Sequence, residues 1–327
     1  MTQVPGMYGD VKLLAGTSTP DLSQEISTYL TSKMGHPIPL IQRQIKKFAN
    51  DNTFVRLGES VRGQDVYVIQ TMSRPVNDNI MELLIILDAV RRDSAGRITV
   101  VMPYMTYTRS DKKDLPRTPI TARLVADLIE VAGADRYMTI DLHAGQIQGF
   151  FRIPGDVLTA HHRLVDYVRA NVPLENLVVS TADLGFAKGG RNWARDLGLP
   201  LALIEKNRTE AGVAAKSVVG NVEGRDVLLV DDEIDTAGSI LEAVSLLERE
   251  DANEISIAFT HAVFSPPALD RLGQLQDRVR NIIFTNTIPH APDDMLPNMR
   301  VISVAPLLGE VIFRAHMGRS VGELFNE

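Results

Sequence analysis

The sequence predicts an α/β protein of two similar units, each with a mainly parallel sheet flanked by helices. Short apolar runs alternate with amphipathic helical patterns along the 327 residues, and the second half repeats the order of the first. Parallel strands and their crossover helices follow one another in this way. The 44% of hydrophobic residues can fill two cores, and the length fits two domains of roughly 150 residues.

In the first half, strands are expected at 66–70, 98–104 and 137–142. A helix is expected at 78–92, started by Asn77 or Asp78, because leucine, isoleucine and valine recur on one face. Another helix is expected to start with Thr118 as the N-cap and Pro119 at the first helical position.

The second half is expected to hold strands at 177–180, 199–204, 227–230 and 255–260. A turn at 153–156 and a new helix near His161 place the domain boundary close to residue 160. We therefore expect domains at 1–160 and 161–303, with the segment 304–327 packing back on the N-terminal domain.

Composition excludes several classes of protein. Thirty-four Lys and Arg stand against 41 Asp and Glu, a net charge of −7, which disfavours a nucleic-acid-binding surface. The absence of cysteine excludes disulfides and thiolate metal sites and suits a cytoplasmic protein. No apolar run approaches the ~18 residues of a membrane span, and the N-terminus lacks a signal-peptide pattern. We expect a soluble, cytoplasmic protein with no nucleic-acid or membrane partner.

The segment 227–239 is the most informative, because an apolar strand leads to acids, a small-residue turn and a helix starting at Ile240. Asp231 and Asp232 can accept hydrogen bonds from the two neighbouring hydroxyls of a ribose. Consecutive backbone N–H groups before a helix can bind a phosphate. The candidate phosphate loop is Asp235, Thr236, Ala237, Gly238 and Ser239. The alternative is a strand-end aspartate with Thr236 or Ser239 merely capping a helix.

Two further segments concentrate positive charge. The loop 104–118 carries Arg109, Lys112, Lys113 and Arg117 after a strand, where open α/β sheets bind ligands, so it is either a lid over phosphates or a solvated surface. Lys206 and Arg208 follow another strand. Fixed cations there could stabilise a transferring diphosphate, or they could be an ordinary basic turn.

Two residues are candidate metal ligands. His143 stands at the end of a strand, where a lone histidine is more often structural. Magnesium prefers oxygen ligands, so Asp183, which follows the strand at 177–180, is chemically the better candidate.

Taken together, these segments resemble the ribose-phosphate diphosphokinase family, also called ribose-phosphate pyrophosphokinases or phosphoribosyl diphosphate synthetases. The resemblance covers nearly the whole chain. It is carried by the segments 59–63 (ESVRG), 74–79 (RPVNDN), 104–119, 141–151 (DLHAGQIQGFF), 230–239, 285–289 (TNTIP) and 303–308 (SVAPLL).

The resemblance implies two phosphoribosyltransferase-like domains and a magnesium-dependent reaction. In that reaction the β,γ-diphosphate of ATP is transferred to the 1-hydroxyl of ribose 5-phosphate. The products are AMP and 5-phosphoribosyl 1-diphosphate, which feeds nucleotide, histidine and tryptophan biosynthesis. It also implies a homohexamer built from dimers.

The resemblance also implies roles for single residues. Asp231, Asp232 and the loop 235–239 would hold ribose 5-phosphate, and Lys206, Arg208 and Arg109 would be the catalytic cations. Arg109 and Lys112 would lie near the ATP phosphates, and Phe48 would stack on adenine. His143 and Asp183 would bind Mg2+.

Several positions depart from the family pattern, which leaves the nucleotide preference open. Residues 49–52 (ANDN) replace a usual Ser-Asp-Gly-Glu after Phe48, and Ser110 replaces a glutamine. Asn207 replaces an arginine, and Thr181-Ala182 replaces a single proline before Asp183. These two departures are expected to reshape the part of the site that holds metal and phosphate.

Relatives in this family are often activated by phosphate and inhibited by ADP at a shared interface site. The chain keeps Ser60, Arg62, Gln148 and Asp156 there, but Val157 and Gly145 differ from the pattern. Phosphate and ADP are therefore candidate effectors.

Two other functions share parts of this pattern. A phosphoribosyltransferase would share the phosphate loop but would not need the segments 104–118 and 141–151. A non-catalytic regulatory homologue would keep the fold and lose active-site residues, whereas Arg109, Lys206, Arg208 and Asp231 are all present.

Overall fold

A computed structural model describes residues 8–208 and 214–325. Contacts between residues divide the chain into two units. Unit 1 holds the described residues up to Thr159, together with Thr287–Pro289 and those from Ser303 on. Unit 2 holds the described residues of Ala160–Asn286 and His290–Ile302.

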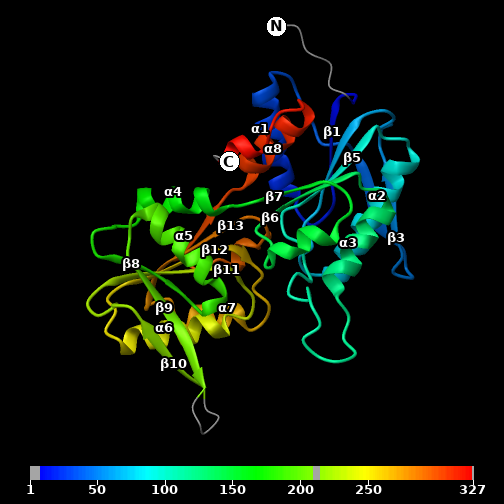
Figure 1. Cartoon of the computed structure of the whole chain (residues 1–327). Coiled ribbons are helices and arrows are strands. Elements are labelled where there is room, and N and C mark those ends of the chain that lie inside the picture. The colour runs from blue at the N-terminus through cyan, green and yellow to red at the C-terminus, as the bar shows by residue number, and fades with distance from the viewer. Residues whose placement is uncertain (1–7, 209–213, 326–327) are drawn as a thin grey trace. The chain divides into compact units, whose positions relative to one another are not determined.

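Unit 1 is built on a parallel five-stranded sheet of order β1-β4-β5-β6-β7 (Figure 1). Its strands are β1 (Val11–Ala15), β4 (Asp65–Ile69), β5 (Arg97–Met102), β6 (Arg136–Ile140) and β7 (Gly155–Leu158). A separate antiparallel hairpin is formed by β2 (Arg43–Lys47) and β3 (Thr53–Leu57). The helices are α1 (Pro20–Met34), α2 (Val76–Arg92), α3 (Thr121–Ala132) and α8 (Ala305–His316), with 3-10 turns η1 (Gly145–Phe150) and η4 (Gly322–Phe325).

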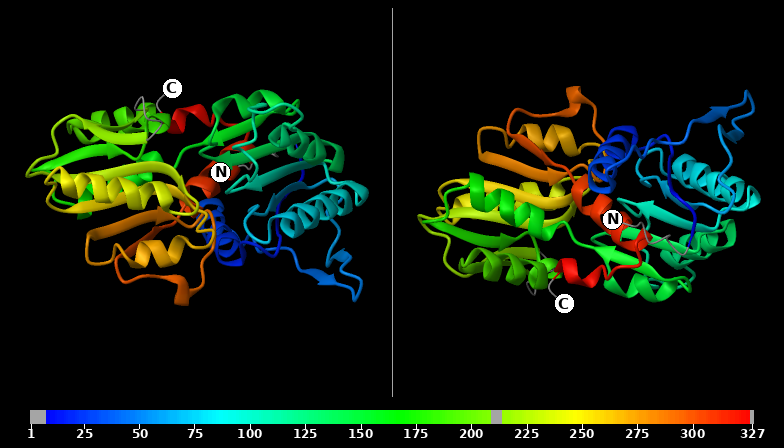
Figure 2. Two further views of the ribbon diagram at one scale, coloured as in Figure 1. Left: turned by 90° about the horizontal axis from the view of Figure 1, so that it is seen from below. Right: turned by 90° about the horizontal axis from the view of Figure 1, so that it is seen from above.

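The helices of unit 1 fall into two pairs. Apolar residues of α2 and α3 form one buried cluster with β4 and β5. The first and last helices, α1 and α8, lie side by side in both views of Figure 2. Tyr29 on α1 donates to Glu310 on α8 at 2.8 Å, and a Cβ added to Gly309 would meet the Tyr29 ring at 2.4 Å. The glycine therefore permits the close approach of these two helices.

Unit 2 is built on a seven-stranded sheet of order β10-β9-β8-β11-β12-β13-β14, in which only β10 runs antiparallel to its neighbour. Its strands are β8 (Leu177–Thr181), β9 (Leu201–Arg208), β10 (Ala214–Val219), β11 (Asp226–Ile234), β12 (Ile255–Ala262), β13 (Val279–Thr285) and β14 (Met299–Ile302). The helices are α4 (His161–Asn171), α5 (Ala187–Leu197), α6 (Gly238–Arg249) and α7 (Ala268–Gly273), with η2 (Leu184–Phe186) and η3 (Pro292–Asp294).

The predicted α/β class is confirmed, and the buried strands explain why the sequence shows it. Every residue of β12 is buried, as is the run 227–230 of β11. Strands of a parallel sheet covered on both faces are apolar throughout, which is the pattern that the sequence shows. Among the described residues, no helix has the length and hydrophobicity needed to cross a lipid bilayer.

Several predicted boundaries were wrong, including the start of α2, which lies at Val76 and not at residue 78. Helix α3 begins at Thr121, not at Thr118 and Pro119, because the backbone N–H groups of Thr121 and Ala122 are bound by the Ser110 hydroxyl and carbonyl. Strand β7 starts at Gly155, inside the predicted turn. Strand β11 continues to Ile234, so the acids Asp231 and Asp232 lie within it and not beyond its end.

Candidate active site

The acid pair of unit 2 lies in β11, between β8 and β12. Each carboxylate accepts a hydrogen bond from the next backbone N–H: Asp231 from Asp232 at 2.9 Å, and Asp232 from Glu233 at 2.8 Å. Burial raises the pKa of the Asp231 carboxyl well above its usual value, and the charges of Asp232 and Asp183 raise it further. The carboxylates of Asp231, Asp232 and Asp183 thus interact near the C-terminal ends of two adjacent strands, β11 and β8.

The neighbouring strand β8 positions Asp183. Because Val230 of β11 pairs with Thr181 of β8, Asp183 follows its strand at the level of the acid pair. The Asp183 carboxylate accepts from the Gly185 N–H at 2.8 Å, and the Thr181 hydroxyl donates to the Asp183 carbonyl at 2.8 Å. These two hydrogen bonds hold Asp183 in place. The family pattern has a single proline before this aspartate, where this chain has Thr181 and Ala182.

The predicted phosphate loop leads directly into α6. The helix begins at Gly238, two residues earlier than expected, so Gly238 and Ser239 form its first turn. Its N-cap, Ala237, has φ 58° and ψ 12°, a left-handed conformation that few residues other than glycine adopt. The backbone N–H groups of a first helical turn have no partner within their helix and can bind an anion. The structure therefore places Asp235, Thr236 and Ala237 in the loop and the last two residues at the helix start.

The sequence did not indicate Arg271, which braces this loop. Arg271 on α7 donates from Nη1 to the Thr236 carbonyl at 2.8 Å, and the same nitrogen lies 3.3 Å from where a Gly238 Cβ would be. Its guanidinium therefore fixes the loop and adds positive charge at the helix start. No motif pointed to it, because α7 is separated from the loop by β12.

Lys206 and Arg208 lie at the end of β9, which pairs with β8 on the side away from β11. Backbone pairing with β10 places Lys206 opposite Lys216 and Arg208 opposite Ala214. The side chains of both predicted cations lie outside the described residues. Leu203 is the last residue of β9 that pairs with β8, and β9 continues beyond it to Arg208.

In unit 1, the loop 104–118 is held at its base and exposed at its tip. The Tyr104 N–H donates to Thr71 Oγ1 at 3.1 Å, and the Tyr107 hydroxyl donates to Asn77 at 2.8 Å. Arg109 and Lys112 are exposed, and Lys112 forms a 3.7 Å ion pair with Asp114. Both predicted cations therefore stand on the solvent-exposed part of the loop.

His143 follows β6, the strand next to β5 from which this loop emerges. The side chain is exposed and precedes the turn η1. Gln146 of that turn donates to Asp111 of the loop, so the two segments are in contact. Since His143 belongs to unit 1 and Asp183 to unit 2, each predicted metal ligand is described only within its own unit.

Phe48 stands at the turn of the β2–β3 hairpin with 47% of its surface exposed. Lys46 lies over its ring at 5.1 Å, and the Phe48 N–H donates to the Asn52 carbonyl at 2.9 Å. Asp51 occupies the position of the glycine in the family pattern and keeps a left-handed φ of 63°. The turn that presents the aromatic ring is thus formed without glycine.

Among the described residues, one cluster has metal-ligand atoms within 4.8 Å of one another: His161, His162 and Asp196. No motif predicted it. His161 is already bound to Asp196 at 2.7 Å, and Arg195 binds the other carboxylate oxygen at 2.7 Å. The hydrogen bond from Arg195 is the main cause that lowers the pKa of Asp196 to about 2, so this carboxylate is engaged by cations of the chain itself.

The α/β fold, with two acids on a strand followed by a loop and a helix N-terminus that can bind phosphate, defines a protein with phosphoribosyltransferase-like domains. Residues 11–133 match the N-terminal domain of ribose phosphate pyrophosphokinase, and residues 213–326 match the phosphoribosyl synthetase-associated domain. The chain belongs to the ribose-phosphate pyrophosphokinase family, as the sequence motifs predicted.

Individual relatives are similar over almost the whole length. The chain is 45% identical to ribose-phosphate pyrophosphokinase of Aquifex aeolicus over 316 residues, covering 96% of this chain and 99% of that protein. It is 45% identical to that of Synechococcus elongatus over 317 residues, covering 96% and 93%. The crystal structure of phosphoribosylpyrophosphate synthetase from Mycobacterium smegmatis has a TM-score of 0.87 and 41% identity, covering 94% of this chain and 98% of that one.

Proposed function

We propose that this chain transfers the β,γ-diphosphate of ATP to the 1-hydroxyl of ribose 5-phosphate, giving 5-phosphoribosyl 1-diphosphate and AMP. The observation that carries the proposal is the sequence of elements in unit 2, where the acid pair of β11 leads through a short loop to the start of α6. Relatives that are 45% identical over 316 and 317 residues are named ribose-phosphate pyrophosphokinase.

Ribose 5-phosphate would bind at this segment. The carboxylates of Asp231 and Asp232 can accept hydrogen bonds from the two ribose hydroxyls, and the loop 235–239 can donate N–H groups to the 5-phosphate. Arg271 would hold the loop in the shape that the phosphate requires, since it already binds the Thr236 carbonyl.

ATP would be held by Phe48, Arg109 and Lys112. An exposed aromatic ring can stack on adenine, and exposed cations on a loop can approach the phosphates from solvent. Ser110 and residues 49–52 differ from the family pattern beside the expected nucleotide site, so the nucleotide preference has to be measured.

In the reaction, the 1-hydroxyl oxygen attacks the β-phosphorus and loses its proton, while the bond to the oxygen bridging to the α-phosphorus breaks and AMP leaves. Negative charge spreads over the oxygens of the transferring group. Lys206 and Arg208 would stabilise that charge as the catalytic cations. Such fixed charges lower the barrier most where water is excluded.

We propose Mg2+ as the cofactor, with Asp183 and His143 as protein ligands. The donor chemistry fits at Asp183, because it supplies a carboxylate near Asp231, whose pKa is raised first by burial and then by the charges of Asp232 and Asp183. When bound, Mg2+ neutralises phosphate charge and orients the nucleotide.

We further propose a homohexamer built from dimers, located in the cytoplasm. Three apolar side chains that lie on one face of α3 are exposed: Leu124 (54%), Leu128 (39%) and Val131 (75%). Such a stripe is typical of a surface covered by another subunit. The absence of cysteine agrees with a reducing compartment. The product would feed nucleotide, histidine and tryptophan biosynthesis.

Phosphate and ADP are proposed as effectors at a site that includes Ser60 and Arg62. Of the other two residues in this expectation, Gln148 is exposed, and Asp156 forms a 2.9 Å ion pair with Arg136.

The decisive assay supplies ribose 5-phosphate, Mg2+ and ATP. AMP and phosphoribosyl diphosphate should form in equal amounts, and Lys206→Ala should abolish both while the circular dichroism spectrum stays unchanged. Release of ADP would overturn the proposed attack on the β-phosphorus. Binding of both substrates without any product would instead indicate the non-catalytic homologue.

A further inference from the structure

Glu82 on α2 is a buried acid that no step of the proposed reaction uses. The residue is 7% exposed. Its carboxylate accepts a hydrogen bond from the Thr17 backbone N–H at 2.7 Å and one from the Thr17 hydroxyl at 2.8 Å. It also accepts a hydrogen bond from Gln70 Nε2 at 3.0 Å. A buried charge is costly unless hydrogen bonds replace its contacts with water, and here the donors come from the segments that follow β1 and β4.

Glu82 sets the orientation of the Gln70 amide, which is fully buried. Gln70 Nε2 faces two acceptors, the Glu82 carboxylate and the Asn79 carbonyl at 3.3 Å. Gln70 Oε1 therefore faces Ser18 and accepts from its backbone N–H at 3.1 Å and from its hydroxyl at 2.6 Å. Because a carboxylate can only accept, the opposite orientation of the amide would place two oxygens against each other. The contact is close, since a Cβ on Gly16 would meet Gln70 Oε1 at 2.1 Å.

The chain of hydrogen bonds continues from Ser18 to the base of the loop 104–118. The Ser18 hydroxyl gives its one hydrogen to the buried amide, so its oxygen accepts from the Thr71 N–H at 3.0 Å. The Thr71 hydroxyl donates to the Thr287 carbonyl at 2.8 Å, and its oxygen accepts from the Tyr104 N–H at 3.1 Å. The orientation of the amide therefore determines the hydrogen bonds at the first residue of the loop that carries the predicted cations.

The segment after β1 also holds the β2–β3 hairpin. Arg43 on β2 donates from Nη2 to the Gly16 carbonyl at 2.9 Å. Lys47, which precedes the aromatic residue at the hairpin turn, pairs with Asp78 on α2 at 2.6 Å. The hairpin is thus attached to the helix that carries Glu82 and to the segment that Glu82 binds.

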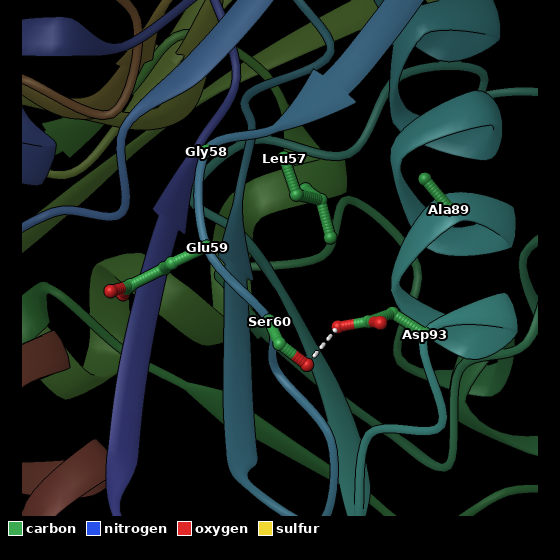
Figure 3. Close-up of a pocket in the computed structure, with 6 residues that line it drawn as sticks. All are labelled: Leu57, Gly58, Glu59, Ser60, Ala89 and Asp93. Atoms are coloured by element: carbon green, nitrogen blue, oxygen red, sulfur yellow. Dashed lines mark hydrogen bonds between the residues drawn. The ribbon is translucent and has the colours of Figure 1, made fainter.

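The pocket shown in Figure 3 lies apart from this network, at the C-terminal end of α2. It contains Ser60 of the proposed effector site, and its acid on the helix side, Asp93, follows Glu82 by eleven residues, about three helical turns. None of the residues that connect Glu82 to the two segments lines this pocket. The pocket therefore provides an internal reference for effects that begin at Glu82.

We propose that Glu82 is a positioning residue for ATP. Through the Gln70 amide, its buried carboxylate holds the base of the loop 104–118, and through the segment after β1 it holds the β2–β3 hairpin. This inference rests on the proposed function, in which these two segments bind the nucleotide. Because ribose 5-phosphate is proposed to bind in unit 2, loss of Glu82 should affect the two substrates differently.

Hydrogen exchange followed by mass spectrometry tests the positioning without turnover. Glu82→Gln keeps the size of the side chain, but its amide nitrogen cannot accept, so one of the donors loses its acceptor. Peptides that contain Thr17 and Tyr104 should exchange about ten-fold faster, as for the loss of one charge-assisted hydrogen bond. Peptides from 57–60, beside the pocket of Figure 3, should keep the natural rate.

Two further variants define the route. Asp88→Asn is the matched control, because Asp88 is another acid of α2 but pairs with Arg92 on the surface, and its exchange should match the natural chain. Ser18→Ala removes the half-buried hydroxyl and leaves Glu82 intact. It should accelerate exchange at Tyr104 while the Thr17 N–H stays protected, and it provides the same test where Glu82→Gln does not fold.

Steady-state kinetics then identify the substrate concerned. Glu82→Gln should raise the KM for ATP by about ten-fold, with the KM for ribose 5-phosphate little changed. Equal rises in both KM values would overturn the proposal. So would natural exchange at Tyr104 in Glu82→Gln or Ser18→Ala, or a rise that extends to 57–60. If the natural chain releases no AMP, the proposed function fails, and the exchange pattern still decides whether Glu82 positions the two segments.

Discussion

Arg97 and Asp65, the first residues of β5 and β4, form a buried ion pair with two hydrogen bonds. Arg97 donates from Nε to Asp65 Oδ1 at 2.8 Å and from Nη2 to Oδ2 at 2.6 Å. The Tyr67 hydroxyl and His316 Nδ1 reach Oδ2 at 3.0 Å and 2.8 Å, and Arg97 also donates to the Ala315 carbonyl. One buried carboxylate therefore joins the ends of β4, β5 and α8.

Loss of the arginine should destabilise unit 1 strongly. Arg97→Met leaves Asp65 buried without its main counter-charge, and breaking a buried pair in this way costs about 3–5 kcal/mol. The midpoint of urea unfolding measures the loss. Arg92→Met is the control, because Arg92 pairs with Asp88 on the surface and exposed pairs contribute little. Similar midpoints for the two variants would contradict the role of the buried pair.

The same carboxylate predicts a dependence of stability on pH. Burial alone would raise the pKa of Asp65, but hydrogen bonds from His316 and Arg97 outweigh it and hold the pKa below its ordinary 3.8. Because the folded-state pKa is the lower one, the stabilisation is fully present above 3.8 and is lost as the pH falls through the folded-state pKa. The stability advantage of the natural chain over Asp65→Asn should shrink in acid below that value. An advantage that is constant from neutral pH into this range would refute the assignment.

Arg271→Gln should weaken the binding of ribose 5-phosphate. The change removes positive charge at the start of α6 and the 2.8 Å bond to the Thr236 carbonyl. We expect the KM for ribose 5-phosphate to rise by about ten-fold, as for the loss of one charge-assisted hydrogen bond, with the KM for ATP little changed. Arg280→Gln is the control, since Arg280 stands near the start of β13 in a surface pair with Glu254. Equal KM values for the natural chain and Arg271→Gln would exclude a bracing role.

The exposed apolar stripe of α3 should be needed for assembly. Leu128→Glu places a charge among Leu124 and Val131 and should shift the protein to smaller species in light scattering after size-exclusion chromatography. Leu115→Glu serves for comparison, because Leu115 is 67% exposed on the loop 104–118 and lies off the stripe. If both variants elute as the natural chain does, α3 is not part of the subunit contact.

The sequence predicted the fold class because buried parallel strands are apolar along their whole length, as in β11 and β12. The sequence did not predict where some helices and strands begin and end, because contacts between residues distant in the sequence determine these positions. Thr118 and Pro119 have the residue types of a helix start, but Ser110, eleven residues before Thr121, binds the first N–H groups of α3. Strand β7 was read as a turn because Gly155 and Asp156 are common in turns.

The site could be predicted in part because its residues are local in sequence. The acids of β11 and the loop before α6 fall within one short segment, so spacing alone indicated a phosphate-binding arrangement. Arg271 could not be found in this way. It binds a loop that is 35 residues away in the sequence, and no local pattern encodes such a contact.

The pairing of α1 with α8 has a consequence for biosynthesis. Because unit 1 contains both helices, the side of α1 that packs on α8 stays uncovered until residues 305–316 have been translated. Unit 2 ends at Ile302, so its sheet can be completed before α8 has been translated. A premature stop codon shortly before Ser303 would therefore harm the half of the molecule that was translated first.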